Sequence, residues 1–237
     1  MFIRDTMNKN GQKESDSMRK EFAVIGLGRL GGSIVKELVS LGAHVMAIDI
    51  SQDKVDDYAQ IATQAVVADT TDEAVLQSLG IKHFEHVVVA IGENIQSSIL
   101  TTLLLKELGV PRITVKAQSD NHEKVLIKIG ADQVVHPERD MGRRLANNML
   151  SNNILDYLEL SDEYSIVEIQ AHERFVGKTL IELDIRARYG VNIVAIKRDG
   201  HLIVSPQAVE QIRGDDILIV IGSDMDIHHF EQQTTHL

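Results

Sequence analysis

The chain has 237 residues, a net charge of -11 and no cysteine, so it can form no disulfide bond and offers no thiolate nucleophile or Cys-ligated zinc site. No apolar run reaches the roughly 18 residues that a membrane span needs, and the acidic balance leaves no extended basic face for nucleic acid. We therefore expect a cytoplasmic protein that does not insert into the membrane and does not bind DNA or RNA.

The chain divides into segments of different character. Residues 1–19 are polar and lack the apolar core of a signal peptide, so we expect a disordered leader or an upstream translation start. Residues 20–140 are predicted to form one domain, residues 141–160 a linker helix, and residues 161–237 a second, smaller domain.

In the first domain, short strand-like runs alternate with helical segments. We predict strands at residues 21–27, 44–50, 64–69, 86–92, 112–117 and 133–138, and helices near 31–42, 51–62, 72–80, 94–109 and 119–130. Glycines at 42, 80, 109 and 130 stand where helices should end. Nearly continuous apolar runs such as VVVAI mark strands buried on both faces, and helical crossovers between them require parallel pairing. The pattern predicts an α/β fold with a Rossmann-type doubly wound parallel sheet.

The linker and the second domain follow a different pattern. Apolar residues at helical spacing predict a helix over 139–160, which either packs on its own sheet or crosses to a second subunit. Beyond it we predict strands at residues 164–171, 191–198, 201–205 and 215–222, and helices near 179–185 and 224–232. Asp199 and Gly200 predict a tight hairpin turn between two of these strands. The second domain is therefore expected to be of the α+β class.

The segment GLGRLGGS, residues 26–33, follows the first strand and opens a helix. Gly26, Gly28 and Gly31 match the pattern G-x-G-x-x-G. The first glycine permits the tight turn, the second lets a phosphate approach the backbone, and the third lets the helix pack against the strand. Asp49 ends the second strand, where a carboxylate accepts hydrogen bonds from ribose hydroxyls and disfavours a 2′-phosphate. Together these features predict an adenine-nucleotide site.

Three further residues belong to the predicted nucleotide site. Leu30 is part of the loop itself. Arg29 adds a positive charge that can reach a terminal phosphate, or it is simply an exposed solubilising charge. Asp69, at the end of the third strand, either borders the adenine side of the crevice or caps the next helix by accepting a backbone N–H. The residues alone leave both alternatives open.

The histidines reveal no catalytic apparatus. A dehydrogenase needs a proton donor with an orienting partner opposite its nicotinamide, and the second domain offers no such pair. His228, His229 and His236 lie in or after the last helix and are expected to be solvated. His136 is better placed, because the sixth strand ends there at the ligand edge of the sheet. An enzyme, namely an NAD-dependent oxidoreductase, is therefore the alternative to a non-catalytic nucleotide-binding protein.

Six stretches carry a resemblance to a known family, and they are FAVIGLGRLGGS, HVMAIDI, VVADTTDEAVLQSLGI, VVVAIGENIQSSILTTLLLKELG, ADQVVHPERDMG and GKTLIELDIRARYGVNIVAIKRDG. From residue 20 to about residue 235, the chain resembles the RCK-domain (regulator of potassium conductance) subunits of Ktr/Trk-type bacterial potassium uptake systems. The resemblance implies a homo-oligomeric ring, typically an octamer, docked on the cytoplasmic side of an integral membrane potassium-translocating subunit. It also implies ATP or ADP in the Rossmann crevice, or NAD or NADH in some members, with ATP favouring the conducting state.

The resemblance also assigns roles position by position. It places the loop glycines and Arg29 around the phosphates, and Asp49 at the ribose. Glu138 in HPERDMG matches an acidic position near the dimer interface that can help to hold a divalent cation beside the nucleotide. The alternative is an ordinary first-turn acid that complements the helix dipole.

The second domain resembles the C-terminal RCK half, which in Gram-positive members binds cyclic di-AMP at its dimer interface and thereby closes the channel. The matching positions are Ile181, Ile185, Arg186, Asn192 and Ile193. Arg186 and Asn192 would bind phosphate or base, and the isoleucines would seat adenine; alternatively, the isoleucines are core and Arg186 is an exposed helix charge. The resemblance predicts a gating subunit of potassium uptake, with an oxidoreductase or a nucleotide-binding scaffold without a transporter as the alternatives.

Overall fold

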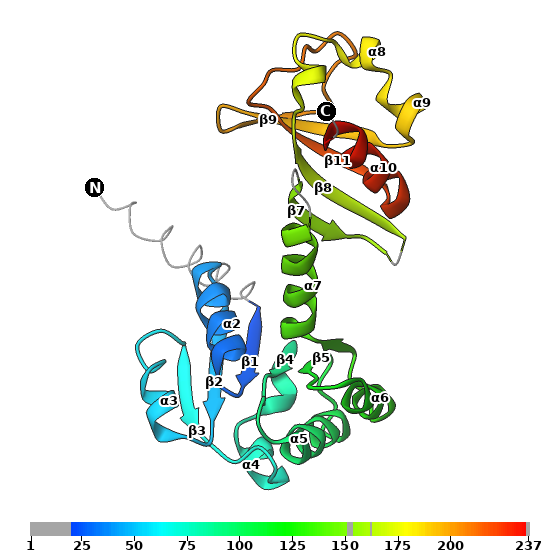
Figure 1. The fold of residues 1–237 in the computed structure, drawn as a ribbon. Helices are drawn as coiled ribbons and strands as arrows, with labels where there is room; N and C mark the ends of the chain where they lie inside the picture. Colours follow the sequence, from blue (N-terminus) through cyan, green and yellow to red (C-terminus); the bar gives the residue numbers. More distant parts are fainter. Residues whose placement is uncertain (1–19, 151–153, 162, 236–237) are drawn as a thin grey trace, which may run out of the picture. The chain divides into compact units, whose positions relative to one another are not determined.

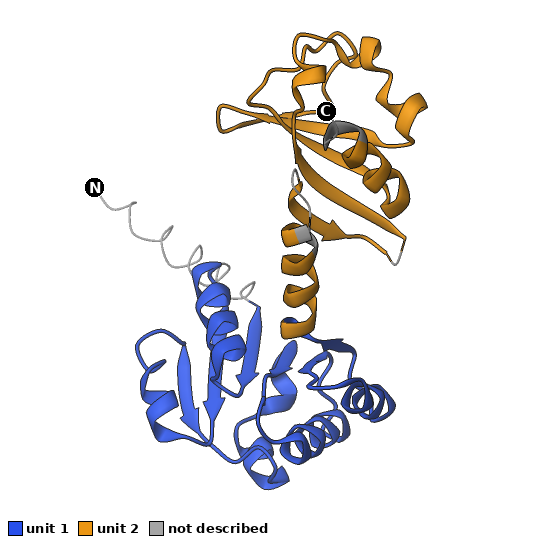
Figure 2. Cartoon of the chain, viewed as in Figure 1, with its two compact units in different colours: residues 1–137 blue, residues 138–237 orange. Residues whose placement is uncertain are grey.

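The computed structural model describes residues 20–150, 154–161 and 163–235, which form two compact units (Figures 1 and 2). The boundary between the units falls between Pro137 and Glu138. The expected leader and His236 lie outside the described residues. Within the described ranges, no helix is both long enough and apolar enough to cross a membrane.

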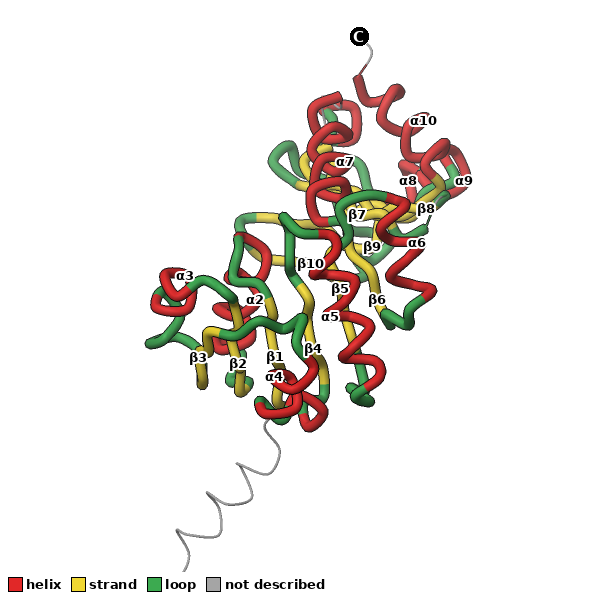
Figure 3. Tube along the Cα trace, turned by 90° about the horizontal axis from the view of Figure 1, so that it is seen from below, coloured by secondary structure: helices red, strands yellow, loops and turns green. Residues whose placement is uncertain are grey.

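Unit 1 is built on a six-stranded sheet with the order β3-β2-β1-β4-β5-β6 (Figure 3). All neighbouring strands of this sheet pair in parallel. Its strands are β1 (Glu21–Ile25), β2 (His44–Asp49), β3 (Gln64–Val67), β4 (His86–Val89), β5 (Ile113–Lys116) and β6 (Gln133–Val135). Its helices are α2 (Arg29–Ser40), α3 (Gln52–Asp56), α4 (Glu73–Ser78), η1 (Ile81–His83), α5 (Ile95–Glu107) and α6 (Asp120–Lys128). The predicted Rossmann-type sheet is confirmed.

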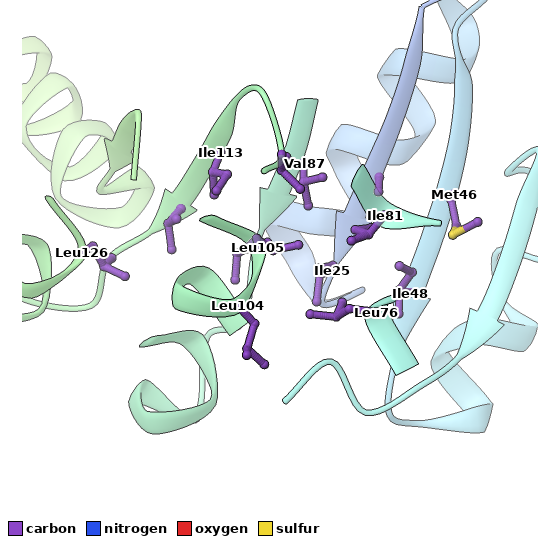
Figure 4. Packing of buried hydrophobic residues seen from close by; sticks show 14 of the residues in the cluster. Ile25, Met46, Ile48, Leu76, Ile81, Val87, Leu104, Leu105, Ile113 and Leu126 are labelled. Atoms are coloured by element: carbon purple, nitrogen blue, oxygen red, sulfur yellow. The ribbon is translucent and has the colours of Figure 1, made fainter. Parts of the chain in front are cut away.

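Two layers of apolar side chains cover the two faces of this sheet. Ala23 and Ile25 of β1 pack in one cluster with residues of α4, α5 and α6, such as Leu105 (Figure 4). Val24, between them in the chain, packs in the other cluster with Val35 of α2. Alternate residues of one strand thus enter opposite cores, which explains why the strands read as continuous apolar runs.

In unit 1 the helix ends agree with the prediction, apart from one helix that is shorter than expected. The glycines expected to end helices all have positive φ, namely Gly42, Gly80, Gly109 and Gly130. The helix predicted over 51–62 is only five residues long. Beyond it the Tyr58 N–H donates to the carbonyl of Val55 at 3.0 Å, a turn of three residues rather than four. Tyr58 lies against α2, where a Cβ added to Gly32 would be 1.8 Å from its hydroxyl.

Unit 2 contains an antiparallel five-stranded sheet with the order β10-β9-β11-β8-β7. Its strands are β7 (Ile154–Glu159), β8 (Tyr164–Gln170), β9 (Asn192–Arg198), β10 (His201–Val204) and β11 (Ile217–Ser223). Its helices are α7 (Pro137–Leu150, whose first residue belongs to unit 1), η2 (Glu173–Phe175), α8 (Leu180–Leu183), α9 (Ile185–Tyr189) and α10 (Asp224–Thr235). The hairpin between β9 and β10 is confirmed, with φ of 50° at Asp199 and 76° at Gly200.

The helix predicted over 139–160 is wrong in its second half. It ends at Leu150, and residues 154–159 form β7, which pairs with β8; residues 151–153 lie outside the described residues. Ile154 packs against the core of unit 2, whereas Leu158 is 57% exposed. The apolar residues of this segment also fit a helical spacing. The segment forms a strand because it pairs with β8, and the periodicity of the sequence does not indicate this pairing.

A buried ionic network holds part of unit 2 together. Arg198 donates two hydrogen bonds to Asp216, from Nε at 2.7 Å and from Nη2 at 2.8 Å, and a third to Glu210 at 2.8 Å. Asp216 is fully buried and also accepts the Arg213 backbone N–H at 2.8 Å. Burial alone would raise the pKa of Asp216, but the hydrogen bonds from Arg198 and Arg213 outweigh it and hold that pKa below its ordinary value.

Candidate nucleotide-binding site

The glycine loop lies at the carboxyl end of β1 and leads directly into α2. Gly26 has a φ of 92°, and a Cβ on it would lie 2.9 Å from the backbone of Ala90. A Cβ on Gly31 would lie 1.9 Å from the carbonyl oxygen of Gly26. At Gly28, by contrast, an added Cβ would meet nothing within 4 Å. The fold therefore requires the first and third glycines, while the second leaves open space where a phosphate can approach.

The start of α2 is suited to an anion. Its N-cap, Gly28, provides no side-chain hydrogen bond, and its first turn contains no acidic residue. Arg29, the first helical residue, is exposed, and among the described residues its guanidinium has no ion-pair partner. Leu30 is half-buried. Uncapped N–H groups, the helix dipole and a free guanidinium all favour a negatively charged ligand here.

Asp49 connects the loop to β2. Its Oδ2 accepts the Leu27 backbone N–H at 2.7 Å, and its Oδ1 accepts the Ser51 N–H at 2.9 Å. A carboxylate has about four acceptor positions, so lone pairs remain for ribose hydroxyls. The Nζ of Lys54 lies 3.6 Å from Asp49, a neighbour that the sequence analysis missed. The sequence signal for this contact is a strand that ends in an acidic residue and is followed by a helix with a basic residue in its first turns.

Asp69 is not the cap of the following helix. It accepts hydrogen bonds from Thr71, at 2.7 Å from Oγ1 and at 3.0 Å from the backbone N–H. These bonds, the side-chain one first, lower the pKa of Asp69. The N-cap of α4 is Asp72, which accepts the Ala74 N–H at 2.8 Å. Asp69 is exposed at the end of β3, beside β2, and its contact with adenine stays a prediction.

The loop after β4 borders the same edge of the sheet, and the sequence analysis assigned it no role. Ala90 donates its N–H to the Ile25 carbonyl at 2.7 Å, next to the glycine loop. Asn94 caps α5 by accepting the Ser97 N–H at 3.0 Å. Gln118 hydrogen-bonds to the carbonyl of Gly92. An Asn before a helix is a sequence signal for an N-cap, whereas the contacts of Ala90 and Gln118 depend on the fold.

In unit 2, the residues predicted to bind cyclic di-AMP differ in exposure. Ile181 is 66% exposed, and Arg186 and Asn192 are also exposed. Ile185 is 5% exposed and belongs to the core, which agrees with the alternative that the isoleucines are core residues. Ile193 is half-buried against that core. Three of the five positions thus offer accessible side chains.

Glu138 and the histidines considered in the sequence analysis lie near or beyond the boundary between the units. Glu138 is exposed in the first turn of α7, and its role in holding a cation stays a prediction. His228 and His229 on α10 are exposed, as expected. His136 is 6% exposed and lies directly after β6.

Comparison with known families defines the class of protein. The TrkA-N domain model matches residues 22–137 and the TrkA-C domain model matches residues 164–234. The chain is 66% identical over 219 residues to Ktr system potassium uptake protein C of Bacillus subtilis, covering 92% of this chain and 99% of that protein. It is 54% identical over 214 residues to Ktr system potassium uptake protein A of the same organism, covering 90% and 96%. The chain therefore belongs to the RCK-domain regulatory subunits of Ktr potassium uptake systems.

Solved structures support the fold assignment. The RCK domain of GsuK superposes with a TM-score of 0.67 at 20% identity, covering 93% of this chain and 49% of that one, so this chain spans about half the length of the solved chain. The GsuK channel bound to NAD gives a TM-score of 0.67 at 20% identity, covering 93% and 40%. The predicted family is confirmed, and with it the prediction of a regulatory subunit of potassium uptake instead of an NAD-dependent oxidoreductase.

Proposed function

We propose that this chain gates a potassium-translocating membrane subunit according to the nucleotide bound at the glycine loop. One observation carries the proposal: the loop packs too tightly for any side chain at Gly31, yet stays open at Gly28 before an uncapped helix start. The names of the Ktr relatives support the link to potassium uptake. In this proposal the subunits form a homo-oligomeric ring, an octamer of paired dimers, that lies in the cytoplasm and is held at the membrane by the translocating subunit.

ATP and ADP are the proposed ligands, with NAD or NADH as competitors for the same crevice. Asp49 would hold the ribose, Asp69 would border the adenine, and Arg29 would contact the terminal phosphate. Glu138 would help to hold a divalent cation beside that phosphate. A ligand shifts a conformational equilibrium only by its difference in affinity for the two states, so ATP must make contacts in one ring state that ADP lacks. We propose that Arg29, which is exposed at the start of α2, makes that contact.

Exchange of Arg29 for alanine tests this assignment. Arg29→Ala should leave ADP affinity nearly unchanged and abolish the preference for ATP, because only the third phosphate loses its guanidinium partner. Calorimetric titration of the nucleotide-free full chain with ATP, ADP and NADH measures both affinities. Lys82→Ala, which removes another exposed cation, is the control and should change neither. Equal losses for ATP and ADP in Arg29→Ala would refute the proposed role.

We infer a second input, cyclic di-AMP, in unit 2. The proposal rests on the sequence match of the five positions and on the exposure of Ile181, Arg186 and Asn192. In the family pattern the ligand binds at the dimer interface and favours the closed channel. Ile185 would contribute only as core support, and Ile193 through its exposed part.

Arg186→Ala should weaken cyclic di-AMP binding by about tenfold or more, because a hydrogen bond to a charged group contributes about 1.5–3 kcal/mol. Titration of the full chain with cyclic di-AMP measures the loss. Arg188→Ala is a matched control, since Arg188 is an exposed arginine on the same short helix. Similar losses in both variants would indicate a general effect of charge and would contradict a specific phosphate contact.

A further inference from the structure

A cluster of two carboxylates and one imidazole lies in unit 1, where α6 begins beside the end of β6. Asp120, Glu123 and His136 each offer one ligand atom, and these atoms all lie within 4.8 Å of one another. Asp120 is exposed, Glu123 is half-buried, and His136 is 6% exposed. None of the three belongs to the predicted nucleotide site, and Glu138 is not a member of the cluster.

The secondary structure fixes these three side chains from two directions. Ser119 caps α6 and accepts the His122 N–H at 3.3 Å, which sets the first helical turn. Asp120 and Glu123 are three residues apart on that turn and therefore share one face of the helix. His136 follows β6, whose Val135 accepts a hydrogen bond from the Ala117 N–H at 2.9 Å. A helix start and a strand end thus bring together residues that are distant in the sequence.

The distances suit coordination of one metal ion. The Nε2 of His136 lies 2.8 Å from Oε2 of Glu123. Two donors bound to the same tetrahedral Zn²⁺ at about 2.0–2.2 Å are themselves roughly 3.3–3.6 Å apart, somewhat more than this direct contact. An ion can therefore replace the direct contact with only a small movement of either side chain.

We propose that Asp120, Glu123 and His136 bind a divalent transition-metal cation, with water completing its coordination. Imidazole suits Zn²⁺ and its neighbours in the first row, whereas Mg²⁺ prefers oxygen ligands alone. The mixed donor set therefore favours Zn²⁺ or Mn²⁺ over Mg²⁺.

A second observation in the same helical turn agrees with a bound ion and its water shell. His122 is 3% exposed, and within the described part of the chain its Nε2 has no hydrogen-bond partner. A buried polar atom without a partner costs free energy unless water or a ligand satisfies it.

Zinc titration of the nucleotide-free full chain tests the site. We expect one binding event, together with a rise in melting temperature, because a ligand that binds only the folded state stabilises it. Asp120→Asn and Glu123→Gln should each lower Zn²⁺ affinity by at least about tenfold. Asp120→Asn is the decisive variant because this side chain is exposed and its exchange should not impair folding, which circular dichroism verifies. Mn²⁺ should bind with the same dependence on the two carboxylates.

A control variant distinguishes this site from other exposed carboxylates. Glu73→Gln, which alters another exposed first-turn acid, should retain wild-type Zn²⁺ affinity. Equal Zn²⁺ affinity in the wild type, Asp120→Asn and Glu123→Gln would place any bound zinc elsewhere and overturn the proposal. A preference for Mg²⁺ over both Zn²⁺ and Mn²⁺ would overturn it as well.

Discussion

Gly31→Ala should abolish nucleotide binding and lower the free energy of unfolding by about 1–3 kcal/mol or more. The added Cβ would lie 1.9 Å from the carbonyl oxygen of Gly26 and 3.2 Å from the Cβ of Ala90. The first of these atoms belongs to the backbone, so no rotamer change relieves the clash. The loop or the start of α2 must move, and the phosphate-binding backbone moves with it. Thermal denaturation and titration with ATP measure the two effects.

The neighbouring glycine provides the control for this expectation. Gly28 has a φ of -72°, and a Cβ on it would meet nothing within 4 Å. Gly28→Ala should therefore change stability by no more than about 0.5 kcal/mol. It should still weaken nucleotide binding, because the methyl group occupies the space through which the phosphate approaches. Wild-type nucleotide affinity in Gly31→Ala would contradict the proposed site.

Arg198→Met should lower the free energy of unfolding by about 3–5 kcal/mol, the range found when one partner of a buried ion pair is removed. The reason is that Asp216 is fully buried and would keep its charge without the guanidinium that compensates it. Urea denaturation measures the loss. Lys197→Met is the matched control, because Lys197 forms only an exposed pair with Glu168 at 3.5 Å, worth about 0–1 kcal/mol. Equal destabilisation by the two variants would contradict this role of the network.

The same network predicts how stability depends on pH. The pKa of Asp216 is lower in the folded protein than the value of about 3.9 in an unfolded chain. Its contribution is therefore fully present above about pH 4 and is lost as the pH falls through the lower, folded-state value. Arg198→Met should lose less stability than the wild type over this acid range, because its Asp216 no longer has the partner that depresses the pKa.

The sequence was sufficient to predict the parallel sheet, the glycine loop and the hairpin at Asp199 and Gly200, because each depends on local pattern. Apolar runs and regularly placed glycines leave few other folds for unit 1. The end of α7 and the strand β7 could not be predicted, since Leu155 and Leu158 fit a helix as well as a strand. Their structure depends on pairing with β8, a contact that the local sequence does not contain.

In the candidate sites, too, the residues that form a local sequence pattern could be predicted, whereas contacts between distant residues could not. The nucleotide-binding motif is recognisable from the sequence alone, and it consists of Gly26, Gly28, Gly31 and Asp49. The capping role of Asp72, instead of Asp69, depends on where α4 begins. Asp120 and Glu123 meet His136 only because β5 and β6 are neighbours in the sheet, so this cluster was visible only in the fold.

Potassium flux is the most informative single measurement on this protein. Liposomes containing the potassium-translocating subunit of a Ktr system would be combined with the purified full chain and either ATP or ADP. We expect rapid flux with ATP, slow flux with ADP, and no difference between the nucleotides when the chain carries Arg29→Ala. Equal flux with ATP and ADP in the wild-type protein, under conditions where both nucleotides are bound, would contradict nucleotide-controlled gating.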